Sequence, residues 1–161
     1  MTDESDNPRR AAVRRHNEGL ERAAKQTAQQ QAARDEREKK WQQDRTEWVT
    51  AARQAITLGV EKSNNEFRTE ECPYVIAERG DTHVSVSYHI VPIQRSRMPP
   101  PASFSFVLKN DGNVHPETTA NGCEDFPAPI AVRSVTAEWA EKVSDCVMNA
   151  VLGGQRMRIP D

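Results

Sequence analysis

Within the stretch 82–91, residues 83–90 alternate strictly between polar and apolar side chains. A period of two, carried by β-branched and aromatic residues, is typical of a β-strand with one buried and one solvated face. The apolar positions of this stretch are Val84, Val86, Tyr88 and Ile90, and the polar ones are His83, Ser85, Ser87 and His89. We therefore expect a sheet whose apolar side is covered by the rest of residues 46–153.

Further strand patterns lie on both sides of this stretch. A short apolar run covers residues 74–78, and residues 79–81 have the composition of a turn. Residues 103–109 alternate again, with their apolar positions facing inward. The Asp111-Gly112 pair that follows favours a type I′ hairpin turn, and a short return strand is expected to end at Pro116. The pattern predicts an antiparallel meander of three strands, or four if the last piece pairs.

Two amphipathic helices are predicted to cover the sheet. The first carries an apolar stripe from about residue 46 and must end by Cys72, because Pro73 restricts that residue to extended conformations. The second begins after Thr136, its predicted N-cap, and is expected to stop at Gly153. The stripes are Trp48, Ala52, Ala55, Ile56, Gly59 and Val60 in the first helix, and Trp139, Val143, Cys146, Val147, Ala150 and Val151 in the second. The fold class is α+β, a two-layer α-β-β-β-(β)-α arrangement with both helices on one sheet face.

Residues 9–45 are predicted to form a long, charged helical arm. Strong helix formers dominate it, and opposite charges recur four residues apart. A heptad register runs through Val13 and Leu20, but its other positions are mostly small or polar, so the seam is weak. The arm is either a solvated single helix or a weak coiled-coil or docking helix. Residues 1–8 are expected to be a disordered tail, residues 46–153 a single domain and residues 154–161 a C-terminal tail.

Composition narrows the classes of function. Residues 1–53 hold 12 of the 22 Lys and Arg and 10 of the 24 Asp and Glu, which leaves 10 basic and 14 acidic residues in the remainder. An acidic folded part argues against nucleic-acid binding. No run is apolar enough for a membrane span, and the first ten residues have no apolar core of a signal peptide. Three widely spaced cysteines favour a reducing compartment, so the expected location is the cytoplasm.

The candidate binding residues are those of the polar sheet face, His83, Ser85, Ser87 and His89, and two arginines of the proline-rich loop, Arg95 and Arg97. Small hydroxyls on a flat face can accept a peptide or a second subunit, and arginines on a stiff loop can engage a carboxylate. His83 and His89 are about 20 Å apart along a strand, too far to share a metal ion. No motif indicates a catalytic residue, a metal ligand or a cofactor.

These features predict a non-catalytic protein-protein interaction module of the adaptor type. Its partner, another protein or a second copy, would bind the arm or the polar sheet face. One alternative is a nucleic-acid-associated accessory protein, whose element order is similar to that of double-stranded-RNA-binding modules; those modules need lysines where this chain has Thr136-Ala137-Glu138. A second alternative is a small enzyme with a site in the 115–125 loop, using His115 and Cys123 with His83 or His89.

Overall fold

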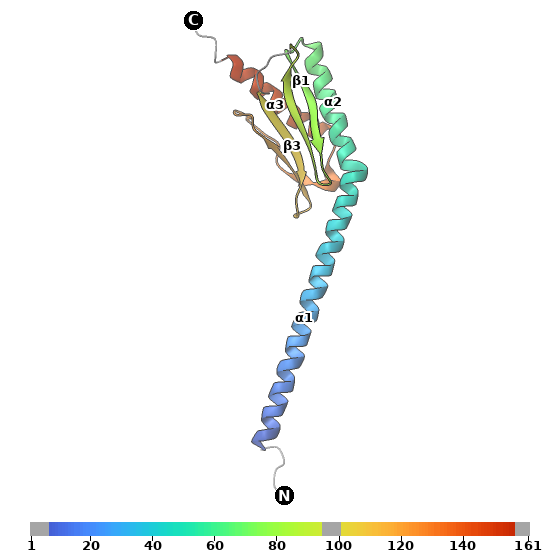
Figure 1. Cartoon of the computed structure of the whole chain (residues 1–161), viewed down its shortest axis with the longest axis vertical. Coiled ribbons are helices and arrows are strands. Elements are labelled where there is room, and N and C mark those ends of the chain that lie inside the picture. The colour runs from blue at the N-terminus through green and yellow to red at the C-terminus, as the bar shows by residue number, and fades with distance from the viewer. Residues whose placement is uncertain (1–6, 95–100, 157–161) are drawn as a thin grey trace. The chain divides into compact units, whose positions relative to one another are not determined.

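The structure is a computed structural model that describes residues 7–94 and 101–156 (Figure 1). Two compact units are present, Met1–Lys40 and Trp41–Asp161, and each is described by itself. The elements in chain order are α1 (Pro8–Glu47), the π-helical segment η2 (Trp48–Ala52), α2 (Arg53–Thr69), β1 (Tyr74–Asp81), β2 (Ser85–Pro92), β3 (Ala102–Leu108), β4 (Asn113–Thr118), β5 (Ile130–Ala131), the 3₁₀ turn η3 (Val132–Ser134) and α3 (Ala137–Arg156). The α+β fold class is confirmed.

The sheet of the second unit is an antiparallel meander in the order β1-β2-β3-β4-β5. The predicted return strand pairs as β4, and it continues through Pro116 to Thr118. Pro116 is tolerated because β5 pairs only with Asn113 and Val114, so the proline lies where the edge of β4 is open. The two-residue strand β5 had no signal in the sequence.

The turn between β1 and β2 is displaced from its predicted position. β1 continues to Asp81 with a bulge between Glu78 and Gly80, and the turn occupies residues 82–84. The Thr82 N–H donates to the Ser85 carbonyl at 2.8 Å, and the Thr82 and Ser85 hydroxyls lie 2.7 Å apart. These local bonds compete with continuation of the strand. His83 therefore lies exposed in a turn and does not share a strand with His89.

The turn between β3 and β4 differs from the predicted type I′. That type requires positive φ at both central residues, and in this turn only Gly112 has it, at 78°. The Gly112 N–H donates to the Lys109 carbonyl at 3.0 Å, and the Lys109 N–H donates to the Asn113 carbonyl at 3.0 Å. This is a three-residue hairpin loop closed by a glycine in the left-handed region. The Asp111 carboxylate stabilises it by accepting the Asn113 N–H at 2.9 Å.

Helices α2 and α3 pack on the same face of the sheet, as predicted, and the core lies between the two layers. Residues buried from the strands include Val86, Tyr88, Ile90, Phe104, Phe106, Leu108 and Val114; those from the helical layer include Trp48, Ala52, Ile56, Val60, Ala140, Val143, Val147 and Met148. α2 and α3 approach closely at Gly59, where a Cβ atom would lie 2.2 Å from the Ala137 carbonyl oxygen.

Three predictions about α3 can be compared with the structure: its N-cap, its C-terminal end and its buried face. The N-cap is confirmed, because the Trp139 N–H donates to Thr136 Oγ1 at 3.2 Å. The predicted stop at Gly153 is wrong: α3 runs to Arg156, since a glycine costs a helix only about 1 kcal/mol and does not by itself end it. The buried face is centred on Ala140, Ser144 and Met148 in addition to the predicted valines, which leaves Trp139, Cys146 and Ala150 half-buried at its margins.

No helix in residues 7–94 and 101–156 has both the length and the apolar character needed to cross a membrane.

Candidate functional site

The face of the sheet opposite α2 and α3 carries mostly small polar side chains, and we call it the outer face. Its members alternate with the buried residues of the same strands and are half-buried, except for Glu117, which is exposed. The register places Ser87 opposite Ser105, His89 opposite Ser103 and Ser105 opposite Glu117. The outer face consists of Ser85, Ser87, His89, Ser103, Ser105, Val107, His115 and Glu117. Serine hydroxyls from β2 and β3, together with two polar side chains of β4, thus form one continuous, mainly polar surface.

A shallow depression of about 220 Å³ lies on this face. Serine hydroxyls and one residue of each charge line it, Arg79 and Glu117. Small-molecule sites are usually about 300–1,000 Å³ and mainly apolar, so this depression is too small and too polar for one. It suits single side chains or the backbone of a partner that lies across the sheet. The lining residues are Arg79, Ser87, Ser103, Phe104, Ser105, Glu117, Thr118 and Thr119.

The predicted binding residues do not all come together. Ser85, Ser87 and His89 lie on the outer face, whereas His83 lies in the β1–β2 turn. Arg95 and Arg97 lie outside the described residues. The His89 Nδ1 atom is buried and has no hydrogen-bond partner in the described part of the chain. It is therefore a polar atom that a bound group could satisfy.

Arg79 and Glu117 were missed as members of the depression. Arg79 lies at the β1 bulge, which no local sequence signal indicates. Glu117 was missed because the return strand was expected to end at Pro116. Glu117 Oε1 forms an ion pair with Lys109 Nζ at 2.9 Å. Both side chains are about half exposed, so the pair contributes less than about 1 kcal/mol to the free energy of unfolding.

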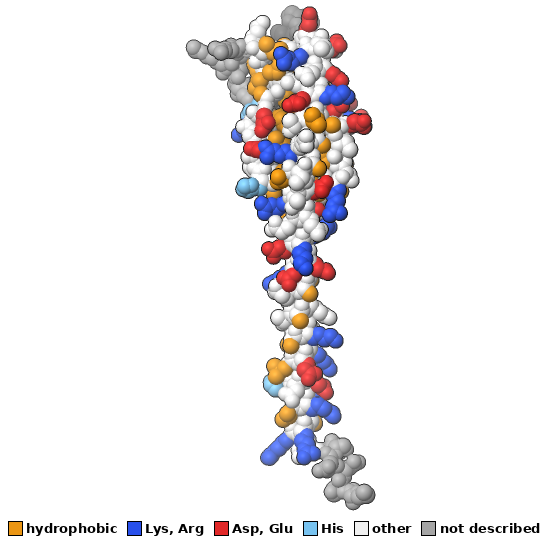
Figure 2. All heavy atoms as spheres, turned by 90° about the vertical axis from the view of Figure 1, so that its right-hand side faces the viewer, with side chains coloured by type: hydrophobic (Ala, Val, Ile, Leu, Met, Phe, Trp, Pro, Cys, Tyr) orange, Lys and Arg blue, Asp and Glu red, His pale blue; other side chains and the backbone are white. Residues whose placement is uncertain are grey.

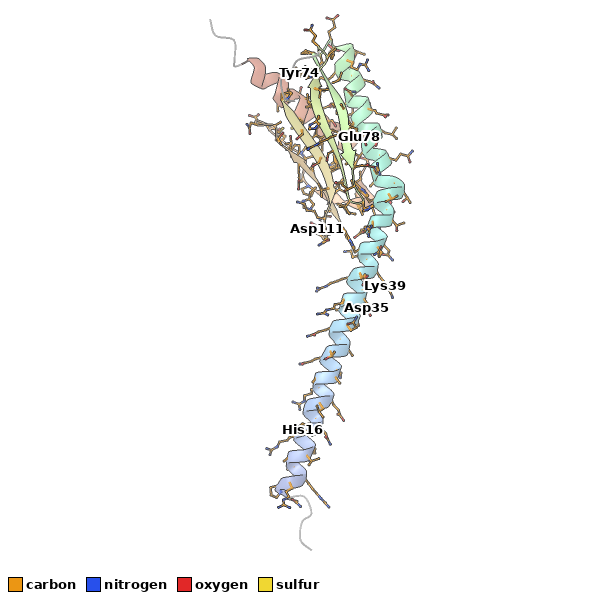
Figure 3. The ribbon with its side chains drawn as sticks, in the orientation of Figure 1. His16, Asp35, Lys39, Tyr74, Glu78 and Asp111 are labelled. Atoms are coloured by element: carbon orange, nitrogen blue, oxygen red, sulfur yellow. The ribbon has the colours of Figure 1, made fainter. Side chains whose placement is uncertain are left out.

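A polar contact between two side chains lies at the tip of the β3–β4 hairpin, where Figure 3 labels Asp111. His115 Nε2 is 2.8 Å from Asp111 Oδ2. The Asn113 backbone N–H, followed by the His115 side chain, lowers the pKa of Asp111 below its ordinary value. His115 is thus engaged within its own hairpin.

A larger groove of about 830 Å³ lies between the loop before β5 and the solvent side of α3. Three carboxylates and one lysine line it, together with the Cys146 side chain. His115 is not among its lining residues, which are Asn121, Gly122, Glu124, Asp125, Pro127, Lys142, Asp145, Cys146, Asn149, Ala150 and Gly153. The 115–125 loop therefore contributes to a groove, but the structure does not bring His115 and Cys123 together there.

Cys123 and Cys146 meet where this loop contacts α3. The Cys146 thiol donates to the Glu124 carbonyl at 3.1 Å, and the Cys123 thiol donates to the Cys146 carbonyl at 3.8 Å. Burial, and next the neighbouring Cys146 thiol, raises the pKa of Cys123 to about 11. A thiol that is protonated at neutral pH is a poor nucleophile.

Cys146 was predicted to point into the core as part of the apolar stripe of α3. That prediction is wrong, because its side chain points toward the loop. Its stripe neighbours Val143 and Val147 are fully buried, whereas Cys146 is half-buried and faces the loop. The described residues contain no group of three or more His, Cys, Asp or Glu placed to hold a metal ion.

The helix of the first unit is a different kind of surface. From Ala12 to Lys40 every residue is exposed, and the side chains point away from the helix axis, as His16, Asp35 and Lys39 do in Figure 3. Val13 and Leu20, seven residues apart, expose 60% and 57% of their surface. Figure 2 shows both basic and acidic side chains along it, and Glu18 lies 3.7 Å from Arg14 and 4.0 Å from Arg22. These pairs are too exposed to stabilise the helix by more than a few tenths of a kcal/mol.

A scan against protein-family models, a search of curated proteins and a search of solved structures each find no match to this chain.

Proposed function

We propose that the protein is a cytoplasmic, non-catalytic interaction module. The second unit acts as a stable scaffold, and the helix of the first unit associates with a helix of a second copy in a weak coiled coil. One observation carries the proposal: 29 consecutive residues, 12–40, form helix and are all exposed. A long helix whose side chains at residues 12–40 are all exposed offers a large surface to a partner.

The two exposed aliphatic side chains indicate which side of the helix associates. Val13 and Leu20 are one heptad apart, so they lie on the same face of the helix. The residues one and two heptads further on, Thr27 and Arg34, bury little apolar surface in such a seam. The association is therefore expected to be weak and to depend on protein concentration. The outer face of the sheet provides a second surface for a protein partner.

The cytoplasmic location rests on the chemistry of the cysteines. Cys72, Cys123 and Cys146 are all free thiols in the structure. Free thiols are kept reduced in the cytoplasm and are oxidised in secreted proteins. A chain whose three cysteines are unpaired suits the reducing compartment.

Sedimentation equilibrium of the full chain over a range of concentrations tests the proposal. Leu20→Lys places a charge in the seam and is expected to shift the monomer–dimer equilibrium toward monomer by at least about tenfold, equivalent to about 1.4 kcal/mol. Gln29→Lys is the matched control. It adds the same charge nine residues away, which is the opposite side of a helix at 100° per residue, and should leave the equilibrium unchanged. Equal dissociation constants for the two variants, or a wild-type chain that is monomeric throughout, would refute the arm-based association.

A second candidate, an association with nucleic acid, is favoured by the arginines at the start of α1. Arg9, Arg10, Arg14 and Arg15 are all exposed, and no acidic residue lies in the first turn. Fluorescence anisotropy with labelled single- and double-stranded oligonucleotides tests it. Binding that weakens steeply with salt, and that weakens further in Arg14→Gln/Arg15→Gln, would support it. An affinity that does not change with salt concentration, or the absence of binding at low salt, would exclude an association with nucleic acid.

A further inference from the structure

Two thiols link the loop at residues 119–129 to α3. Each thiol donates a hydrogen bond to a backbone carbonyl of the other segment. Cys146 of α3 donates to the carbonyl of Glu124, the residue after Cys123, at 3.1 Å. Cys123 donates in return to the carbonyl of Cys146 at 3.8 Å. Each sulfur therefore contacts the backbone of the segment that carries the other sulfur. This reciprocal arrangement brings the two side chains to the same place.

The two thiols differ in access. Cys146 lines the groove of about 830 Å³, so a small molecule in the groove can reach its sulfur. Cys123 packs against the margin of the hydrophobic core and is not part of the groove lining. The third cysteine, Cys72, is buried with 6% of its surface exposed and serves as an internal reference.

We propose that Cys123 and Cys146 are a modification site at which a low-molecular-weight disulfide, such as oxidised glutathione, converts the thiol pair to a reversible intramolecular disulfide. In the first step the Cys146 thiolate attacks one sulfur of the glutathione disulfide. The glutathione sulfur–sulfur bond breaks, one glutathione leaves as a thiolate and takes up a proton, and a mixed disulfide remains on Cys146.

In the second step Cys123 loses its proton, and its thiolate attacks the Cys146 sulfur. The mixed disulfide breaks, the second glutathione leaves and is protonated, and a bond joins Cys123 to Cys146. In sum, the two protein thiols lose two electrons and two protons, and one glutathione disulfide becomes two glutathione thiols. The reduced thiols of a reducing cytoplasm, such as glutathione, reverse these two steps and restore the free cysteines.

The environment of Cys123 makes the second step the slower one. Burial raises the pKa of Cys123 to about 11, so little thiolate is present at neutral pH. The pair therefore stays reduced until a mixed disulfide holds the Cys146 sulfur beside it. The bond, once formed, ties the wall of the groove to α3, because residues 119–129 contain no regular helix or strand of their own.

The test uses the full chain, incubated in redox buffers with rising ratios of oxidised to reduced glutathione, quenched with acid and weighed by intact-protein mass spectrometry. The expected product has a mass lower by about 2 Da, for the two hydrogens lost, and yields a peptide linking Cys123 to Cys146 after digestion without reductant. Dithiothreitol should restore the reduced mass. Cys72→Ser is expected to form the same bond, whereas Cys123→Ser should stop at the mixed disulfide on Cys146.

A second readout follows the loop itself. Oxidation should slow limited proteolysis within residues 119–129 at least about threefold in the wild-type chain and leave the cleavage rate of Cys123→Ser unchanged, because a cross-linked loop opens less often. Two results would overturn the proposal: a wild-type chain that accumulates only glutathione adducts at full oxidation, or a linked peptide that contains Cys72.

Discussion

The two units each contain a helix with an internal glycine, and the two glycines have opposite surroundings. No atom comes within 4 Å of where a Cβ would lie at Gly19 of the first unit. At Gly59 of the second unit, the same Cβ would lie 2.2 Å from the Ala137 carbonyl oxygen and 2.8 Å from the Ala140 Cβ. One residue type in one secondary structure thus serves two purposes. In the first unit glycine only lowers helix propensity, whereas in the second it permits two helices to touch.

This difference shows what holds each unit in its conformation. The first unit depends on the intrinsic preference of Ala, Gln, Glu, Lys and Arg for helix, because it buries almost nothing. The second depends on tertiary packing, because two helices cover one face of its sheet and the side chains of the core between them are buried. Substitutions should therefore change helix content in the first unit and the free energy of unfolding in the second.

The largest expected effect is that of Gly59→Ala. The added methyl group meets backbone atoms of α3, which cannot move without separating the helices, so we expect a loss of about 3 kcal/mol in the free energy of unfolding. Urea denaturation followed by tryptophan fluorescence measures it, since Trp48 and Trp139 both lie in the helical layer.

Gly19→Ala is the matched control, and it is expected to increase helix content slightly by circular dichroism, with no change in the urea midpoint. A midpoint that falls equally in both variants would contradict the division of roles between the units.

Gly112→Ala should have the next largest effect, about 2 kcal/mol. Gly112 has a φ of 78°, and a Cβ there would lie 2.8 Å from Asp44 Oδ2. Gly122 has a similar φ of 82° but nothing within 4 Å, so Gly122→Ala isolates the backbone strain alone, about 1 kcal/mol. The difference between the two urea midpoints measures the contact with Asp44. Equal losses would show that the buried Asp44 side chain moves aside at no cost.

The N-caps of α1 and α3 give a third comparison. Thr136→Ala removes the acceptor for the Trp139 N–H and should cost about 1 kcal/mol of stability. Asn7→Ala removes the acceptor for the Arg9 N–H, a bond of 3.0 Å at the start of the first unit. It should reduce helix content at that end and leave the urea midpoint unchanged. A loss of stability in Asn7→Ala would mean that the start of α1 contributes to the fold of the second unit.

The smallest effect depends on pH. The pKa of Cys123 rises from 9.0 to about 11 on folding, so its protonated form is favoured in the folded state. This stabilisation is complete below pH 9 and is lost as the pH rises toward 11. Because the thiol is only partly shielded from water, we expect a contribution of less than about 1 kcal/mol. Under reducing conditions the difference in unfolding free energy between the wild-type chain and Cys123→Ser should shrink across this range. A difference that is constant from pH 8 to 11 would contradict the raised pKa.

Local patterns were sufficient to predict the layers of the second unit. The alternation that ends at Ile90 identified the central strand and its buried face, and the helical spacing of Trp48, Ile56 and Val60 identified the covering helix. Thr136 was recognised as an N-cap because capping needs only neighbouring residues. These features depend on contacts within one element or on the simple rule that apolar faces are buried.

The features that were missed depend on contacts between elements or on competing local bonds. The hydrogen bonds between Thr82 and Ser85 place the β1–β2 turn, and they remove His83 from the predicted polar face. The β1 bulge puts Arg79 in the outer-face depression. The direction of Cys146 follows from where a distant irregular loop packs on α3, which a helical stripe cannot indicate. The placement of the candidate residues was therefore only partly predictable: Ser85, Ser87 and His89 lie on the outer face of the sheet, whereas His83 lies in a turn.

Light scattering after size exclusion, applied to the full chain and to a chain that begins at Trp41, tests the central claim most directly. The shorter chain retains every residue of the second unit and lacks the exposed helix of the first. We predict that the full chain approaches the mass of a dimer as its concentration rises, and that the shorter chain remains a folded monomer at every concentration. If both the full and the shorter chain are dimers, the association lies on the second unit instead. If both are monomers, the exposed helix does not bind a second copy of itself.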